Sequence, residues 1–126
     1  MRFRNVLVVD DSQDQADVLV ALLRQEPGVV AVSCTNAATA LDLLDQDWKI
    51  DLVVSDYMMP GIDGLELASE IRRARPEIPV VLVTGHDEAI DRIAAGGGIA
   101  LLKPFTVEAL RSVLREHLPL PSPRDR

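Results

Sequence analysis

A chain of 126 residues has the length of one ordinary domain and can bury one sizeable core. Its net charge of −7 argues against nucleic-acid binding, because phosphate backbones are contacted by clustered Lys and Arg. No apolar run approaches the roughly 20 residues of a membrane helix, and the N-terminus lacks the apolar stretch of a signal peptide. The single cysteine, Cys34, fits a reducing compartment, so we expect a cytoplasmic protein that binds neither membrane nor nucleic acid directly.

Short apolar runs alternate along the chain with helical patterns. The runs predict strands over 6–9, 29–33, 52–55, 79–84 and 99–103. Apolar residues spaced three and four apart predict five helices. The first starts after a cap at Ser12 and the last after a cap at Thr106. The three between them span 37–47, 64–74 and 87–95. Strict alternation with short connections predicts right-handed crossovers and a parallel sheet covered by helices on both faces.

Polar residues stand where four of these strands end. Asp10 and Asp11 follow the first strand, Asp56 the third, Thr84 ends the fourth and Lys103 the fifth. Ligands bind outside the carboxyl ends of strands in α/β sheets. Three carboxylates in one pocket repel each other unless a cation or proton intervenes, and Mg²⁺ suits such a site. An alternative is that the first two acids only favour the start of the first helix.

Thr84 and Lys103 fit a group that the resting protein lacks. A phosphoryl group has three equatorial oxygens, which a metal ion, a hydroxyl and an ammonium could each contact. Asp56 would then be the nucleophile and would form an acyl phosphate on its own carboxylate. The alternative is that Lys103 merely neutralises the acids and that Thr84 is an ordinary strand residue.

Four segments, in this order and each at a strand end, resemble the receiver domain of bacterial two-component response regulators. They are Val8-Val9-Asp10-Asp11-Ser12, residues 56–64, Val83-Thr84-Gly85-His86 and Leu101-Leu102-Lys103-Pro104-Phe105. The resemblance extends from Asn5 to about Leu118 and implies a receiver domain over 1–118. It also implies an α/β, flavodoxin-like, doubly wound sheet of five parallel strands in the order 2-1-3-4-5, with helices on both faces.

The resemblance further implies that Asp56 accepts phosphate from a sensor histidine kinase or phosphotransfer protein of a phosphorelay. The implied Mg²⁺ ligands are Asp10, Asp11, Asp56 and the backbone carbonyl of Met58. Thr84 and Lys103 look like the pair that responds to phosphorylation. Such a domain is no enzyme for external substrates, although it takes part in its own phosphorylation and dephosphorylation. It signals to a downstream protein target by a conformational change, and a homodimer is left open.

Two features depart from the family pattern. Ala100 stands at the aromatic switch position, three residues before Lys103, and a methyl group cannot swing between buried and exposed states. The 19 positions from Thr84 to Lys103 are a few short of the usual spacing, so the fourth helix is expected to be short, and three glycines follow it. We therefore expect atypical switching, through the backbone of 85–98 or through another surface.

His86 and Met58 each lie two residues beyond a predicted site residue. At these positions they overlook the pocket and could tune the access of water to the acyl phosphate. The alternative is that they are simply solvated loop residues.

Three other functions are compatible with parts of the pattern. A haloacid-dehalogenase-type phosphatase needs a second acid two residues after its nucleophile, where Met58 stands. A flavin carrier needs a Ser/Thr- or Gly-rich loop after the first strand, where Asp10 and Asp11 would repel a phosphate. A docking module insensitive to phosphorylation is the third.

The ends of the chain bear on its domain organisation. Met1 begins the domain directly and no output domain follows, so we expect a single-domain regulator. The Pro-rich, charged residues 119–126 predict a tail or the start of a linker. They support the alternative of a receiver cut from a longer regulator or hybrid histidine kinase.

Overall fold

The computed structural model describes residues 3–46, 48–59, 61 and 63–118, so the predicted tail over 119–126 lies outside the described residues. Strands and helices alternate along the described chain, as predicted. The strands are β1 (Arg4–Val9), β2 (Val29–Cys34), β3 (Leu52–Asp56), β4 (Val80–Thr84) and β5 (Ile99–Leu102). The helices are α1 (Gln13–Arg24), α2 (Ala37–Leu44), α3 (Gly64–Ala74), α4 (Ala89–Ala95) and α5 (Val107–His117).

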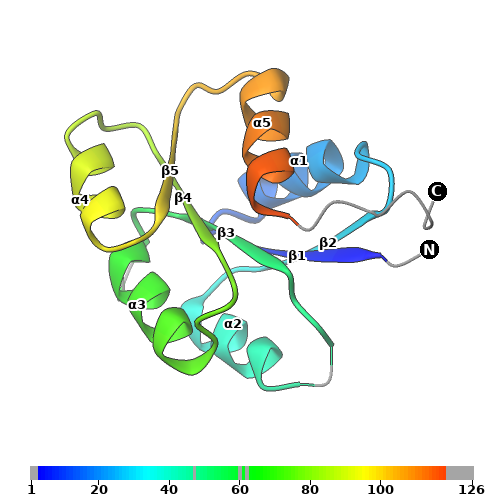
Figure 1. Ribbon diagram of the computed structural model, residues 1–126, viewed down its shortest axis with the longest axis horizontal. Coiled ribbons are helices and arrows are strands. Elements are labelled where there is room, and N and C mark those ends of the chain that lie inside the picture. Colours follow the sequence, from blue (N-terminus) through cyan, green and yellow to red (C-terminus); the bar gives the residue numbers. More distant parts are fainter. Residues whose placement is uncertain (1–2, 47, 60, 62, 119–126) are drawn as a thin grey trace.

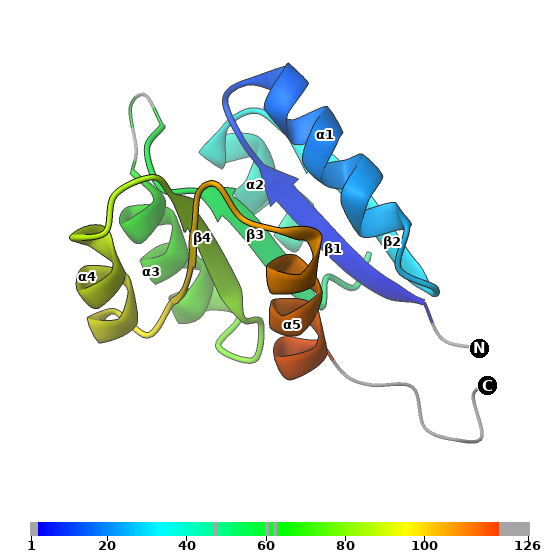
Figure 2. The same cartoon turned by 90° about the horizontal axis from the view of Figure 1, so that it is seen from above.

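One parallel sheet contains the five strands in the order β2-β1-β3-β4-β5, which confirms the predicted flavodoxin-like topology. The helices α1 and α5 cover one face of the sheet and α2, α3 and α4 the other (Figure 1, and from above in Figure 2). Val9 pairs with Ser55, and Asp56 pairs with Val83. The strands therefore end nearly level, and the polar residues that follow them meet at one edge.

Alternate residues of the central strands fill two separate hydrophobic cores. In β1, Val6 and Val8 join the core beneath α1 and α5, whereas Leu7 and Val9 join the core beneath α2, α3 and α4. All four side chains are fully buried, which explains why the strand reads as an unbroken apolar run. Burial of such a side chain stabilises the fold by about 1.5–3 kcal/mol. The edge that carries the polar residues therefore belongs to a rigid scaffold.

Side-chain caps define where most helices begin. The capping side chains, each accepting a hydrogen bond from a backbone N–H three residues later, are those of Ser12, Asn36, Asp63 and Thr106. By contrast α4 begins at Ala89, two residues later than predicted, and Glu88 before it makes no side-chain cap bond. The predicted end of the second helix at residue 47 lies outside the described residues, and α2 ends at Leu44.

Membrane insertion is a question of helix length and polarity. Within the ranges that the structure describes, none of the helices combines the length and apolar character that crossing a bilayer requires.

Candidate functional site

Three carboxylates converge at the carboxyl edge of the sheet. Asp10 follows β1 and is buried, Asp11 is exposed, and the side chain of Asp56 at the end of β3 is 15% exposed. One oxygen from each of the three lies within 4.8 Å of the others. Carboxylates this close repel each other, and a hard divalent cation relieves that repulsion. The set of oxygen donors therefore fits the Mg²⁺ site expected from the sequence.

Asp10 also supports the start of α1. Its Oδ1 accepts a hydrogen bond from the backbone N–H of Ser12 at 2.9 Å, and Ser12 Oγ accepts one from the N–H of Gln15 at 3.3 Å. The alternative in which Asp10 favours the start of the first helix therefore agrees with an observed hydrogen bond. That contact occupies Oδ1 and leaves Oδ2 for a cation, so the two roles are compatible.

The charge state of Asp56 reflects competing neighbours. Burial has the largest effect and raises the pKa of Asp56 above its ordinary value. The ammonium of Lys103 lowers this pKa, the charges of Asp10 and Asp11 raise it, and a hydrogen bond with the Met58 backbone lowers it. The balance favours the protonated form more than in an ordinary Asp. A bound cation would act in the opposite direction and favour the carboxylate.

Gly64 lies directly against the end of β3, which carries Asp56. Its N–H donates to the carbonyl of Tyr57 at 2.8 Å, which joins the start of α3 to the end of β3. A Cβ at this position would lie 2.7 Å from the Asp56 carbonyl oxygen and 2.9 Å from the Tyr57 Cα. The backbone φ at Gly64 is not positive, so the residue serves close approach rather than an unusual turn.

Lys103 and Thr84 are neighbours across the end of the sheet. The N–H of Lys103 donates to the Thr84 carbonyl at 2.7 Å, and Lys103 Nζ lies 3.8 Å from Asp56 Oδ1. Thr84 is 2% exposed, and its Oγ1 accepts a hydrogen bond from the N–H of His86 at 3.1 Å. The structure thus brings the ammonium close to the carboxylate and places the hydroxyl on the adjacent strand end.

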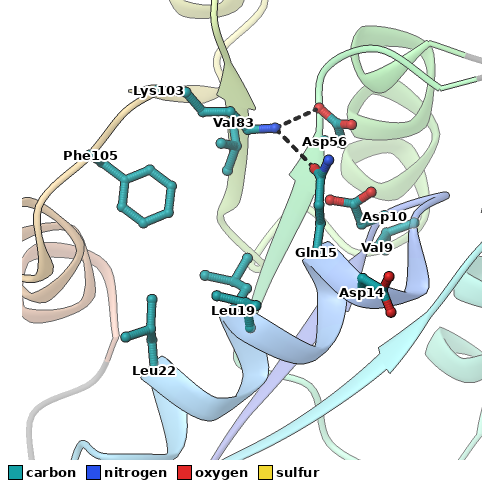
Figure 3. Close-up of a pocket in the computed structure, with 11 residues that line it drawn as sticks. Val9, Asp10, Asp14, Gln15, Leu19, Leu22, Asp56, Val83, Lys103 and Phe105 are labelled. Carbon is teal, nitrogen blue, oxygen red and sulfur yellow. Dashed lines mark hydrogen bonds and ion pairs between the residues drawn. The ribbon is translucent and has the colours of Figure 1, made fainter.

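A groove of about 400 Å³ opens beside Asp56, between α1 and the segment that follows β5 (Figure 3). Its apolar walls are formed by Val18, Leu19, Leu22 and Phe105, among others. At its polar end Lys103 Nζ donates to Gln15 Oε1 at 3.4 Å. The sequence reasoning missed Gln15, because its contact joins residues 88 positions apart and no local pattern marks it.

Met58 and His86 line a second hollow of about 240 Å³ together with Tyr57, Glu88 and Arg92, among others. Met58 is 61% exposed, and His86 Nδ1 lies 3.7 Å from Glu88 Oε1. Both residues therefore lie in the loops beside Asp56 and Thr84, where their side chains face solvent. The position of Met58, two residues after Asp56, is compatible with its carbonyl acting as a metal ligand.

Ala100 is half-buried on β5, where it pairs with Leu82 and packs against the core beneath α2, α3 and α4. The helix that precedes β5 in the chain, α4, has only seven residues. A small side chain on the edge strand and a short α4 are the two departures noted in the sequence.

Comparison with known proteins decides the family. Residues 6–115 match the family described as response regulator receiver domain. The chain is a receiver domain. Sensory transduction protein RegX3 of Mycobacterium tuberculosis is 36% identical to it over 118 residues, which cover 88% of this chain and 51% of the relative. The receiver domain thus spans about half the length of this curated relative, and the resemblance inferred from the four segments is confirmed.

Solved structures agree with this assignment. TrrA of Thermotoga maritima, in complex with Mg²⁺-BeF, has a TM-score of 0.82 and 28% identity, covering 92% of this chain and all (100%) of the other. NtrX of Brucella abortus has a TM-score of 0.84 and 32% identity, covering 92% of this chain and 27% of the other. The receiver domain therefore belongs to two-component signalling.

Proposed function

We propose that Asp56 accepts a phosphoryl group from a phosphohistidine of a sensor histidine kinase or phosphotransfer protein. The position of its carboxylate carries the proposal, since Asp56 lies within the acid cluster with Lys103 Nζ 3.8 Å away. A carboxylate oxygen attacks the phosphorus and the P–N bond of the donor breaks. Its electron pair remains on the imidazole nitrogen, and an acyl phosphate forms on Asp56. Family membership supports this chemistry.

Thr84 and Lys103 would bind the arriving phosphoryl oxygens. The Thr84 oxygen accepts the His86 N–H, so its own O–H proton remains available to donate. The Lys103 ammonium has three donors on a flexible stem and can follow a phosphoryl oxygen.

Asp10, Asp11, Asp56 and the backbone carbonyl of Met58 would hold Mg²⁺. Bound there, the ion would offset the negative charge of the phosphoryl oxygens and of the carboxylates. The Mg²⁺-BeF complex of TrrA supports this assignment by similarity.

The apolar groove supports a protein as the phosphoryl donor. Val18 in its wall is 63% exposed, and Leu19, Leu22 and Phe105 lie beside it. An apolar surface next to the phosphoacceptor can be buried by a partner that presents a phosphohistidine to Asp56. The net charge of −7 disfavours direct contact with nucleic acid, so the downstream target is proposed to be a protein as well.

We further propose that the signal leaves the site through the loop before α4 rather than through an aromatic switch. Thr84 Oγ1 accepts the N–H of His86, and the carbonyl of His86 accepts the N–H of Ala89 at the start of α4. Movement of the hydroxyl towards a phosphoryl group would therefore displace the backbone that leads into α4. Hydrogen exchange with and without beryllofluoride tests this route. Unchanged exchange over 85–98 would refute it.

The phosphoacceptor assignment is tested by intact mass after incubation with acetyl phosphate. Wild type with Mg²⁺ is expected to gain one phosphoryl adduct, and both Asp56→Asn and removal of Mg²⁺ are expected to abolish it. If no adduct forms and beryllofluoride causes no NMR shifts, the domain is instead a docking module insensitive to phosphorylation. The decay of the adduct in His86→Ala and Met58→Ala tests whether these residues tune hydrolysis.

A further inference from the structure

Among the residues that the structure describes, two acceptors lie beside the ammonium of Lys103, and the nearer is not the proposed phosphoacceptor. Lys103 Nζ lies 3.4 Å from Gln15 Oε1 and 3.8 Å from Asp56 Oδ1 (Figure 3). The first contact is a long hydrogen bond, and the second is an ion pair beyond hydrogen-bond distance. The Lys103 side chain is 37% exposed, so packing alone does not fix its flexible stem. The Gln15 amide oxygen therefore helps to determine where the ammonium rests.

The backbone of Gln15 is fixed at the start of α1 by a cap that Asp10 supports. Asp10 Oδ1 accepts the Ser12 N–H at 2.9 Å, and Ser12 Oγ accepts the Gln15 N–H at 3.3 Å. The Gln15 side chain then reaches from the first turn of α1 across the end of the groove to Lys103. These contacts lead from Asp10 through the α1 cap to Lys103, which faces Asp56. The cap thus places the Gln15 backbone where its side chain can reach the Lys103 ammonium.

An uncharged acceptor suits a lysine that has to move. A carboxylate at position 15 would hold the ammonium as a full ion pair, and it would add another negative charge to the pocket. An aliphatic side chain would offer no acceptor, so Lys103 would either close on Asp56 or turn to solvent. The amide of Gln15 avoids both outcomes and can yield the ammonium to an arriving phosphoryl oxygen.

We infer that Gln15 is a positioning residue, which holds the Lys103 ammonium beside the Asp56 carboxylate until a phosphoryl group arrives. Gln15 contacts Lys103 and acts on the reaction only through it. This inference rests on the proposed phosphorylation of Asp56, but the contact itself can be tested without phosphorylation.

Lysine dynamics provide that first test. The chain has only two lysines, Lys49 and Lys103, so ¹³C-lysine labelling gives one ε-methylene signal for each. Gln15→Leu removes the acceptor at similar size. Gln13→Leu is the matched control, because Gln13 lies in the same turn but donates to Asp17 Oδ1 at 2.8 Å.

NMR relaxation is expected to show an ordered Lys103 methylene in wild type and in Gln13→Leu, and a more mobile one in Gln15→Leu. The Lys49 signal serves as the internal reference and is expected to stay unchanged. Equal mobility of Lys103 in all three proteins would overturn the inference.

The second test is the rate of phosphorylation by acetyl phosphate in a double-mutant cycle. Gln15→Leu is expected to slow wild type by roughly three- to tenfold, as expected for one lost hydrogen bond, and to have no further effect in Lys103→Ala. An equal slowing in both backgrounds would mean that Gln15 acts through the helix, and the inference would fail. If wild type forms no adduct at all, the proposed function fails, while the mobility of Lys103 still decides whether Gln15 holds it.

Discussion

Replacement of Gly64 by alanine tests how closely α3 approaches the end of β3, where Asp56 lies. The new Cβ would lie 2.7 Å from the Asp56 carbonyl oxygen, 2.9 Å from the Tyr57 Cα and 3.0 Å from Leu82 Cδ2. Two of these atoms belong to the backbone and cannot rotate away. Since ordinary contacts begin at 3.4 Å, the start of α3 and the end of β3 must separate by several tenths of an ångström.

The expected cost follows from this forced separation. Overpacking of a well-packed site destabilises by about 1–3 kcal/mol. Alanine regains up to about 1 kcal/mol over glycine in a helix, although less at the first helical position. We therefore expect Gly64→Ala to lower the free energy of unfolding by about 1–2 kcal/mol. The rate of phosphorylation should fall as well, because the displaced backbone carries the Asp56 carboxylate.

Urea denaturation measures this change through the transition midpoint. Gly85→Ala is the matched control, because a Cβ on Gly85 would meet nothing within 4 Å and its φ is not positive. The control is expected to stay within about 0.5 kcal/mol of wild type, as is usual for surface substitutions. A Gly64→Ala protein as stable as the control would refute the argument that close approach requires glycine here.

Three further changes have defined outcomes. Asp56→Asn should raise the free energy of unfolding at neutral pH in EDTA, because burial raises the pKa of Asp56. In wild type the buried Asp56 carboxylate lowers the free energy of unfolding fully above its pKa, and this destabilisation disappears as pH falls through that pKa. The urea midpoints of wild type and Asp56→Asn should therefore converge in acid. Thr84→Ala should cost about 1 kcal/mol by removing the acceptor of the His86 N–H, whereas Thr84→Ser should not, as differential scanning calorimetry can show. Thr106→Ala should cost about 1 kcal/mol by removing the cap on the Ala109 N–H, and loss of helical circular dichroism at a lower temperature than in Thr106→Ser would show it.

The fold could be predicted because its signals are local. The apolar run of β1 and the helical spacing of α1 each lie within one segment, and their periods identify the elements directly. The acids and the lysine of the site share this property, since each lies within two residues of the end of a strand. A residue at a strand end is placed by the topology alone.

The start of α4 and the role of Gln15 depend on hydrogen bonding and packing that no local sequence pattern contains. The N–H groups of Ala89 and Ile90 bond to carbonyls three residues earlier, which is a turn rather than an α-helix, so the acids at 87 and 88 precede the helix. The contact between Gln15 and Lys103 depends on how closely α1 packs beside the end of β5, and only the folded structure contains that distance.

The two separate cores give the domain two faces that can change independently. Val8 packs with α1 and α5, beside the groove that would receive a phosphoryl donor, whereas Leu7 packs with α2, α3 and α4, where the proposed output lies. Neighbouring residues of β1 thus pack on opposite faces of the sheet. A substitution in one core therefore changes a side chain that belongs to one cluster and not to the other. Donor recognition and output could therefore diverge separately in related domains, while the edge that carries Asp56 stays the same.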